Sequence, residues 1–180
     1  MYDLTELQRD ANRMFNFSAK ETLSIMQSLY ERHKVLTYPR TDSRYLTDDM
    51  VETLKDRLEA ISIESYREYA RKILKGPIRA NKSFVDNKRV TDHHAIIPTE
   101  EKVRYSELSF KERQVYDLVV KRFLAVLYHP FEYEETRIRL DLGGESFRAK
   151  GKRVIKEGWK SIYSNSYQDD EDEEDIMDQS

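Results

Sequence analysis

The sequence predicts a mainly α-helical protein with a smaller β portion towards its C-terminal end. Apolar residues recur at helical spacing through most of residues 1–130, and the period changes to two within residues 131–163. The last residues, 164–180, are strongly acidic and poor in apolar side chains, a composition that cannot build a core. We therefore expect a helical domain, a β-rich piece and a disordered acidic tail over these three ranges.

The first two helices are predicted from capping signals. Asp3 and Thr5 are each followed three residues later by Glu or Gln, and apolar residues then keep helical spacing to Phe15. Ser18 begins a second helix whose apolar stripe reaches Tyr30. Two helices joined by a tight turn predict a helix-turn-helix shape, which many DNA-binding proteins use. The outward polar residues of this pair are candidates for DNA contact: Gln8, Arg9, Asn12, Arg13 and Gln27.

Two shorter helices are expected in the middle of the chain. Thr47 precedes one of them, and Ser62 precedes the other, which Gly76 and Pro77 stop. The stretch 78–92 is polar and basic and has no period, so it predicts a loop or a weak extended segment.

The longest helix and a β-hairpin follow. Ser109 and Glu112 form a capping-box pattern for a helix that ends before Pro130. Alternating apolar and polar residues then predict strands on both sides of Gly143-Gly144, a typical hairpin turn.

The composition limits the class of protein. At 180 residues the chain is long enough for one domain, or for one and a part. Charged residues make up 36% and hydrophobic residues 38%, which indicates a soluble protein with a modest core. No apolar run has the length of a membrane span, and the N-terminus has no signal-peptide pattern. The absence of cysteine excludes disulfides and thiolate metal sites and fits a reducing cytoplasm.

The formal net charge of −3 hides an uneven distribution. Eight of the 34 acidic residues, and no basic residue, lie between Asp169 and Asp178. Without them 26 acidic residues face 31 basic ones, so the rest of the chain carries about +5 by the same count. A basic body suits a polyanionic partner, although an ordinary mixed-charge surface gives a similar balance.

A tyrosine and an arginine two residues apart are the main candidates for chemistry. Pro39 biases Tyr38 towards an extended conformation, and side chains of an extended segment alternate, so we expect Tyr38 and Arg40 on one side. A phenol can attack phosphorus, and a guanidinium can bind two phosphate oxygens and favour the phenolate. A buried aromatic residue beside a surface arginine has the same spacing and is the alternative interpretation.

Three stretches, in this order, resemble the type IA DNA topoisomerases. The segment Leu36–Ser43 resembles the active-site tyrosine signature of that family, and Leu4–Asn12 resembles the helix that opens its tyrosine-bearing domain. The run His93–Thr99 resembles its His-x-Ala-Ile-x-Pro-Thr element. Residues 17–32 and the Glu-Gly-Trp at 157–159 are similar to the topoisomerase III branch.

The resemblance implies roles for individual residues. Tyr38 would attack a single-strand phosphodiester, join the 5′ phosphate and leave a free 3′ hydroxyl, without ATP, while Arg40 stabilises the charge. His93 would contact the scissile phosphate or assist proton transfer. Thr41 and Asp42 would hold the catalytic residues in position, Asp42 by pairing with Arg40 or by capping a turn. Ser43 joins the candidates for DNA contact. His94 has no assigned role, and two adjacent histidines argue against a metal site.

The resemblance also implies what lies outside this chain. The family's metal-binding acids, catalytic lysine and catalytic glutamate belong to a separate N-terminal domain, so Mg²⁺ is expected there and no cofactor is expected here. Residues 131–163 would form one half of a β-rich arch domain. We expect a fragment that is inactive alone, with single-stranded DNA and the remaining domains of the same enzyme as partners. A monomer in the cytoplasm, associated with the nucleoid and with no membrane partner, is expected.

Two alternatives remain open on the residues alone. A non-catalytic helix-turn-helix module would bind duplex DNA with sequence discrimination and would not need Tyr38. A site-specific tyrosine recombinase would need arginine three residues after a histidine, where this chain has Ile96 and Ile97.

Overall fold

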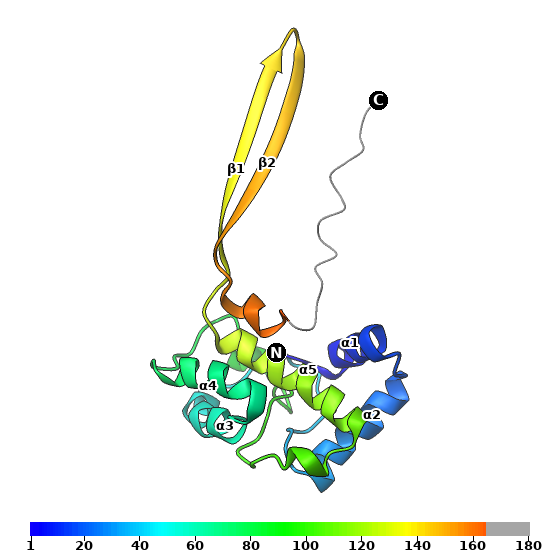
Figure 1. The fold of residues 1–180 in the computed structure, drawn as a ribbon. Coiled ribbons are helices and arrows are strands. Elements are labelled where there is room, and N and C mark those ends of the chain that lie inside the picture. The colour runs from blue at the N-terminus through cyan, green and yellow to red at the C-terminus, as the bar shows by residue number, and fades with distance from the viewer. Residues whose placement is uncertain (165–180) are drawn as a thin grey trace. The chain divides into compact units, whose positions relative to one another are not determined.

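The computed structural model describes residues 1–164, and the protein is mainly helical with a small β portion, as the sequence predicts (Figure 1). The chain divides into two compact units, Met1–Tyr128 and His129–Ser180, which are described separately below. Apart from Ser164, the acidic tail predicted over residues 164–180 lies outside the described residues. Within the described residues no helix is long and apolar enough to cross a membrane.

Five α-helices build the first unit, and α5 lies between the pair α1–α2 and the pair α3–α4 (Figure 1). Their bounds are α1 Leu4–Phe15, α2 Ala19–Gln27, α3 Leu54–Ala60, α4 Arg67–Leu74 and α5 Phe110–Leu127. The largest fully buried side chains of the core come from all parts of this unit and include Leu7, Met26, Leu36, Leu58, Ile96, Tyr116 and Phe123.

The ends of α1 and α2 follow the capping signals in the sequence. The Asp3 carboxylate accepts a hydrogen bond from the Glu6 backbone N–H at 2.7 Å, so Asp3, not Thr5, is the N-cap of α1. The helix ends at Asn16, whose φ of 58° is the left-handed conformation that asparagine tolerates. Ser18 then caps α2. The predicted pair of helices joined by a tight turn is therefore confirmed.

The second and third predicted helices depart from regular α geometry. After α2 the chain continues as a π-helical turn over Ser28–Arg32, and Lys34 then takes a φ of 59°. The expected helix after Thr47 begins as a 3₁₀ helix over Asp48–Thr53 and becomes α-helical only at Leu54. Apolar spacing does not distinguish these tighter or wider turns from an α-helix, because the same side chains face the core in all three.

The helix α5 has the predicted capping box, in which the Ser109 hydroxyl accepts from the Glu112 backbone and Glu112 accepts from the Ser109 backbone. Its middle is buried on several sides, as expected for a helix that other helices flank.

Three short extended segments pair with one another inside the helical unit, and the sequence did not predict this pairing. The Ile96 backbone N–H donates to Tyr2, and Leu36 forms an antiparallel bridge with Pro98. The Thr37 N–H donates to the Ile97 carbonyl at 3.0 Å. The segment that carries Tyr38 is thus joined directly to the segment that follows His93.

The second unit contains an antiparallel hairpin of β1, Glu132–Leu142, and β2, Glu145–Lys156. The turn is Gly143-Gly144, with φ values of 60° and 90° that suit glycine and a two-residue hairpin loop. A 3₁₀ helix, Gly158–Ile162, follows.

Candidate active site around Tyr38

The Tyr38 ring is held between two other rings. Its centroid lies 4.2 Å from that of the His93 imidazole, at an interplanar angle of 37°. On another side Tyr30 meets it edge-on, with centroids 5.5 Å apart. The Tyr38 side chain is half-buried, whereas His93 is exposed. Such contacts favour one orientation of the phenol, so the ring is positioned before any ligand binds.

Two threonines on either side of Tyr38 fasten its segment to the histidine motif. The Thr37 hydroxyl donates to the Ala95 carbonyl at 3.3 Å and accepts from the Ile97 backbone N–H at 3.0 Å. The buried Thr41 hydroxyl donates to the His93 carbonyl at 2.9 Å. Tyr38 and His93 therefore lie on two segments that are tied together before and after the tyrosine.

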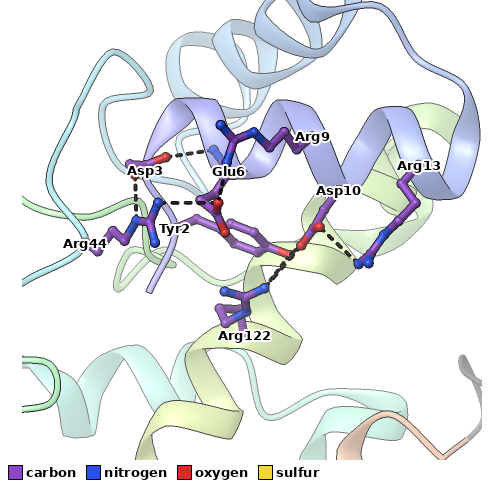
Figure 2. A network of polar contacts seen from close by, with 8 residues as sticks. All are labelled: Tyr2, Asp3, Glu6, Arg9, Asp10, Arg13, Arg44 and Arg122. Carbon is purple, nitrogen blue, oxygen red and sulfur yellow. Dashed lines mark hydrogen bonds and ion pairs between the residues drawn. The ribbon is translucent and has the colours of Figure 1, made fainter. Parts of the chain in front are cut away.

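The end of the tyrosine motif is anchored as well. The Ser43 hydroxyl is buried and donates to the Arg89 carbonyl at 2.7 Å. The next residue, Arg44, forms ion pairs with Asp3, the N-cap of α1, at 2.7 Å and with Glu6, on the first turn of that helix, at 3.3 Å (Figure 2). Since hydrogen bonds satisfy the Ser43 hydroxyl inside the fold, the structure gives Ser43 a supporting position.

Arg40 points into solvent. The Thr41 N–H donates to the Pro39 carbonyl at 3.1 Å, which makes Arg40 the central residue of a tight turn. The extended alternation expected from Tyr38 to Arg40 is therefore interrupted at Pro39. Asp42 is also exposed, and within residues 1–164 neither an ion pair nor a hydrogen bond joins it to Arg40. The guanidinium of Arg40 is thus available to an incoming anion.

The ring of Tyr30 is positioned by a contact that the sequence analysis missed. Tyr30 belongs to the π-helical turn, and the side chains of Ser28, at the start of that turn, and His33, directly after it, reach Glu112 on α5. The Ser28 hydroxyl donates to Glu112 Oε1 at 2.6 Å, and His33 Nε2 lies 3.2 Å from the same oxygen. Burial alone would raise the pKa of Glu112, but the hydrogen bonds from Ser28 and Ser109 and the nearby His33 hold it below its ordinary value.

A second missed residue is Arg57, a buried arginine in α3. It donates to the Pro98 carbonyl at 2.8 Å and pairs with Glu100 at 2.7 Å, and Thr53 accepts from its Nε at 2.9 Å. Burial lowers the pKa of Arg57, while Glu100 opposes that shift. Arg57 thereby fixes the segment that pairs with Leu36, the first residue of the tyrosine motif.

His94 differs from its neighbour His93. It is half-buried, and its Nδ1 lies 2.7 Å from the Ala95 carbonyl oxygen. Burial, assisted by the charge of Arg57, lowers the pKa of His94. The imidazole is therefore neutral at neutral pH, and only His93 of the two contacts the Tyr38 ring.

The candidates for DNA contact on the first two helices fall into separate groups. Gln8 donates to the Ala19 carbonyl and Asn12 donates to the Phe17 carbonyl, each at 3.0 Å, so both amides hold the turn between α1 and α2. Arg9 is exposed and pairs with Glu6 at 3.0 Å. Gln27 is half-buried at the last residue of α2. The structure does not bring these side chains to the Tyr38 ring.

Asp10 joins α1 to α5 through a compact polar network (Figure 2). Its carboxylate accepts a hydrogen bond from the Tyr2 hydroxyl at 2.5 Å and pairs with Arg122 and Arg13, each at 3.1 Å. The Arg122 guanidinium also lies over the Tyr2 ring, 4.2 Å from its centroid. This network explains why the outward Arg13, predicted as a candidate for DNA contact, has an intramolecular partner.

Comparison with known proteins identifies the family. Residues 1–179 match the family described as DNA topoisomerase. The chain belongs to the DNA topoisomerase family. It is 59% identical over 179 residues to DNA topoisomerase 3 of Bacillus thuringiensis strain Al Hakam, covering 99% of this chain and 25% of that protein. It is 58% identical over 175 residues to DNA topoisomerase 3 of Bacillus subtilis strain 168, covering 97% of this chain and 24% of that protein.

A solved structure agrees with this assignment. Full-length topoisomerase I from Thermotoga maritima superimposes with a TM-score of 0.60 at 27% identity, over 91% of this chain and 26% of that one. The predicted type IA family and its topoisomerase III branch are thus confirmed. The chain spans about a quarter of the length of the topoisomerases that it matches.

A divalent metal, expected elsewhere in the topoisomerase, does not fit the residues described here. Across residues 1–164, no group of three or more His, Asp or Glu side chains is arranged to hold a metal ion.

Proposed function

We propose that this part of the topoisomerase supplies the tyrosine that cuts one DNA strand. The positioned ring of Tyr38, between Tyr30 and His93, is the observation that carries the proposal. A nucleophile must approach phosphorus in a defined direction, and a ring that is already held loses less freedom when the strand binds. The exposed Arg40 lies two residues away and can bind the phosphate.

The reaction is an exchange of esters. The Tyr38 phenol oxygen forms a bond to the phosphorus, and the bond from phosphorus to the 3′ oxygen breaks. The phenolic proton is lost as the new bond forms, and the leaving 3′ oxygen gains a proton, so the products are a 5′-phosphotyrosine and a 3′ hydroxyl. Since the broken ester is replaced by another ester, religation is the reverse reaction and needs no ATP.

Arg40 and His93 would assist in different ways. A free phenol ionises at about pH 10, so attack at neutral pH requires stabilisation of negative charge. The solvent-facing guanidinium of Arg40 would provide it for the phenolate and for the phosphate oxygens. His93, exposed beside the Tyr38 ring, would contact the scissile phosphate or take part in proton transfer.

The remaining predicted residues would support these groups. We propose that Thr41 and Ser43 fix the backbone of the tyrosine motif from inside the fold and that Asp42 caps the turn at Arg40. Gln8 and Asn12 would shape the turn between α1 and α2. Arg9 and Gln27 would contact the strand farther from the cut.

The rest of the activity would require the other domains of the enzyme. We propose that they supply Mg²⁺ and the acidic half of the active site, and that they contribute strands that complete the arch with residues 131–163. In the intact enzyme the cut end would stay on Tyr38 while another strand passes. This chain would act as a monomer on single-stranded DNA, in the cytoplasm at the nucleoid, and would not cleave alone.

A covalent-adduct experiment tests the proposal. Single-stranded DNA labelled at its 3′ end would be incubated with Mg²⁺ and this chain, with and without a separately made N-terminal domain, and run on a denaturing gel. We expect a labelled adduct only in the mixture, and none with Tyr38→Phe. Tyr30→Phe is the matched control, because it removes a neighbouring phenol but keeps the ring, and it should still form the adduct. Loss of the adduct in Tyr30→Phe but not in Tyr38→Phe would refute the assignment.

A further inference from the structure

The π-helical turn Ser28–Arg32, which precedes the tyrosine motif, brings two polar side chains to one oxygen atom. The backbone N–H of His33 donates to the Ser28 carbonyl at 3.1 Å, five residues back along the chain. In an α-helix, residues five apart lie roughly 140° apart around the axis, whereas the wider π turn returns them to one face. The Ser28 hydroxyl and His33 Nε2 therefore both reach Glu112 Oε1, at 2.6 Å and 3.2 Å.

The Glu112 side chain is itself held by the start of α5. Its Oε2 accepts a hydrogen bond from the Ser109 backbone N–H at 2.8 Å, within the capping box. That bond leaves Oε1 for the π-helical turn, where Ser28 and His33 donate to it, because a carboxylate only accepts hydrogen bonds. Glu112 is buried, so water competes little for these contacts. One carboxylate thus joins the first residue of the turn, and the residue that follows it, to α5.

Tyr30 lies at the middle of the turn, between the two residues that Glu112 binds. Its neighbour Leu29 is fully buried, which anchors the turn in the core. The Tyr30 ring is 37% exposed and meets the Tyr38 ring edge-on, with centroids 5.5 Å apart. If the turn relaxed to α-helical hydrogen bonding, the positions of its side chains around the axis would change. Tyr30 would then lose its edge-on contact with Tyr38.

We infer that Glu112 is a positioning residue for strand cleavage: it holds the π-helical turn, the turn fixes the Tyr30 ring, and that ring fixes the direction of the Tyr38 phenol. The inference rests on the proposed role of Tyr38 and adds a group that does not touch the reacting atoms. Attack on phosphorus depends on the direction of approach. The effect should therefore appear in the rate of bond formation and leave the DNA affinity unchanged.

The rate of adduct formation at saturating single-stranded DNA tests the inference, in the mixture of this chain with the N-terminal domain and Mg²⁺. Ser28→Ala removes the shorter contact to Glu112 and leaves the capping box of α5, so we expect cleavage to slow by about threefold to tenfold at an unchanged half-saturating DNA concentration. Tyr30→Leu removes the ring and should slow cleavage by about tenfold or more, whereas Tyr30→Phe keeps the ring and should keep most of the rate. Ser24→Ala, at an exposed position of α2, is the matched control.

Combining the variants shows whether the contact with Glu112 acts through Tyr30. Once the ring is gone, the turn has nothing to direct, so Ser28→Ala should cause no further loss of rate in a Tyr30→Leu chain. A merely structural role of Ser28 would give additive losses. Additive losses would overturn the inference, as would a rate for Ser28→Ala equal to that for Ser24→Ala.

A spectroscopic measurement on this chain alone separates the inference from the proposed function. With ¹³C-labelled tyrosine rings, Tyr38→Phe identifies the nuclear magnetic resonance signals of Tyr38, which the neighbouring rings of Tyr30 and His93 shift. Ser28→Ala should move or broaden these signals, and Ser24→Ala should not. Unchanged signals in Ser28→Ala would overturn the inference even if Tyr38 cuts DNA. Changed signals without any adduct in the wild-type mixture would count against the proposed function, while the positioning of the ring by Glu112 would stand.

Discussion

The same residue types are buried in the helical unit and exposed in the hairpin. In Met1–Tyr128 leucines such as Leu7, Leu36 and Leu58 are fully buried, and the charged side chains of Arg57 and Glu112 are buried as well. Along the hairpin, Leu140 is 56% exposed and the charged residues lie on the surface. The first unit therefore has a core whose packing and hydrogen bonds can hold a side chain in one position, whereas the hairpin has extended, exposed surfaces. A buried core suits the proposed role of Tyr38, because it can hold the ring in one position.

Truncating one leucine in each unit is the strongest test of that difference. Leu58→Ala should lower the free energy of unfolding by about 2–5 kcal/mol, because it leaves a cavity among fully buried neighbours. Leu140→Ala should change it by no more than about 0.5 kcal/mol, since its side chain already faces solvent. Urea unfolding followed by far-ultraviolet circular dichroism measures both. Similar losses for the two variants would show that the hairpin is buried in solution.

Removing the buried guanidinium of α3 should have the next largest effect. Arg57→Met keeps most of the side-chain volume but leaves the Pro98 carbonyl without its donor, so we expect a loss of about 1–3 kcal/mol in the same unfolding measurement. Arg67→Met, on the exposed face of the neighbouring helix α4, is the control and should be close to neutral. If Arg57→Met is also neutral, Arg57 does not fix the segment beside the tyrosine motif.

The elements that the sequence predicted well are those with a long repeating pattern. The helices α1 and α5 begin at the predicted capping residues, and the Gly143-Gly144 turn joins the two predicted strands. Each pattern spans ten or more residues, so the local preference and the final packing agree. The proximity of Tyr38 and His93 was expected only through the resemblance to a family.

The features that the sequence missed depend on contacts between distant single residues. The bridge between Leu36 and Pro98 involves segments of two or three residues, too short to show a period. The contact of Tyr30 with Tyr38 depends on a π-helical turn, and apolar spacing does not reveal one. Glu112 was correctly assigned to a capping box, but its second role, as the partner of Ser28, arises from the packing of α5 on that turn.

Replacing Glu112 should change the free energy of unfolding of the helical unit by an amount that depends on pH. Glu112→Gln keeps an acceptor but removes the charge, and we expect a loss of about 1–2 kcal/mol at pH 7. The folded-state pKa of Glu112 is lowered, so its stabilising effect is present above the unfolded-state pKa of about 4.3 and is lost as the pH falls through the folded value. The difference between wild type and variant should therefore shrink in urea unfolding at about pH 3.5.

The same substitution on the hairpin provides the contrast. Glu134 pairs with Arg153 at 2.7 Å, yet the two side chains are 59% and 76% exposed, and exposed pairs contribute at most about 1 kcal/mol and often nothing measurable. Glu134→Gln should thus leave the free energy of unfolding nearly unchanged, and the small effect should disappear in high salt. Because Glu112 is shielded from solvent, its effect should persist at the same salt concentration. If both variants lose stability with the same dependence on salt, the carboxylate of Glu112 is as hydrated as that of Glu134. The π-helical turn would then hold Tyr30 without help from Glu112.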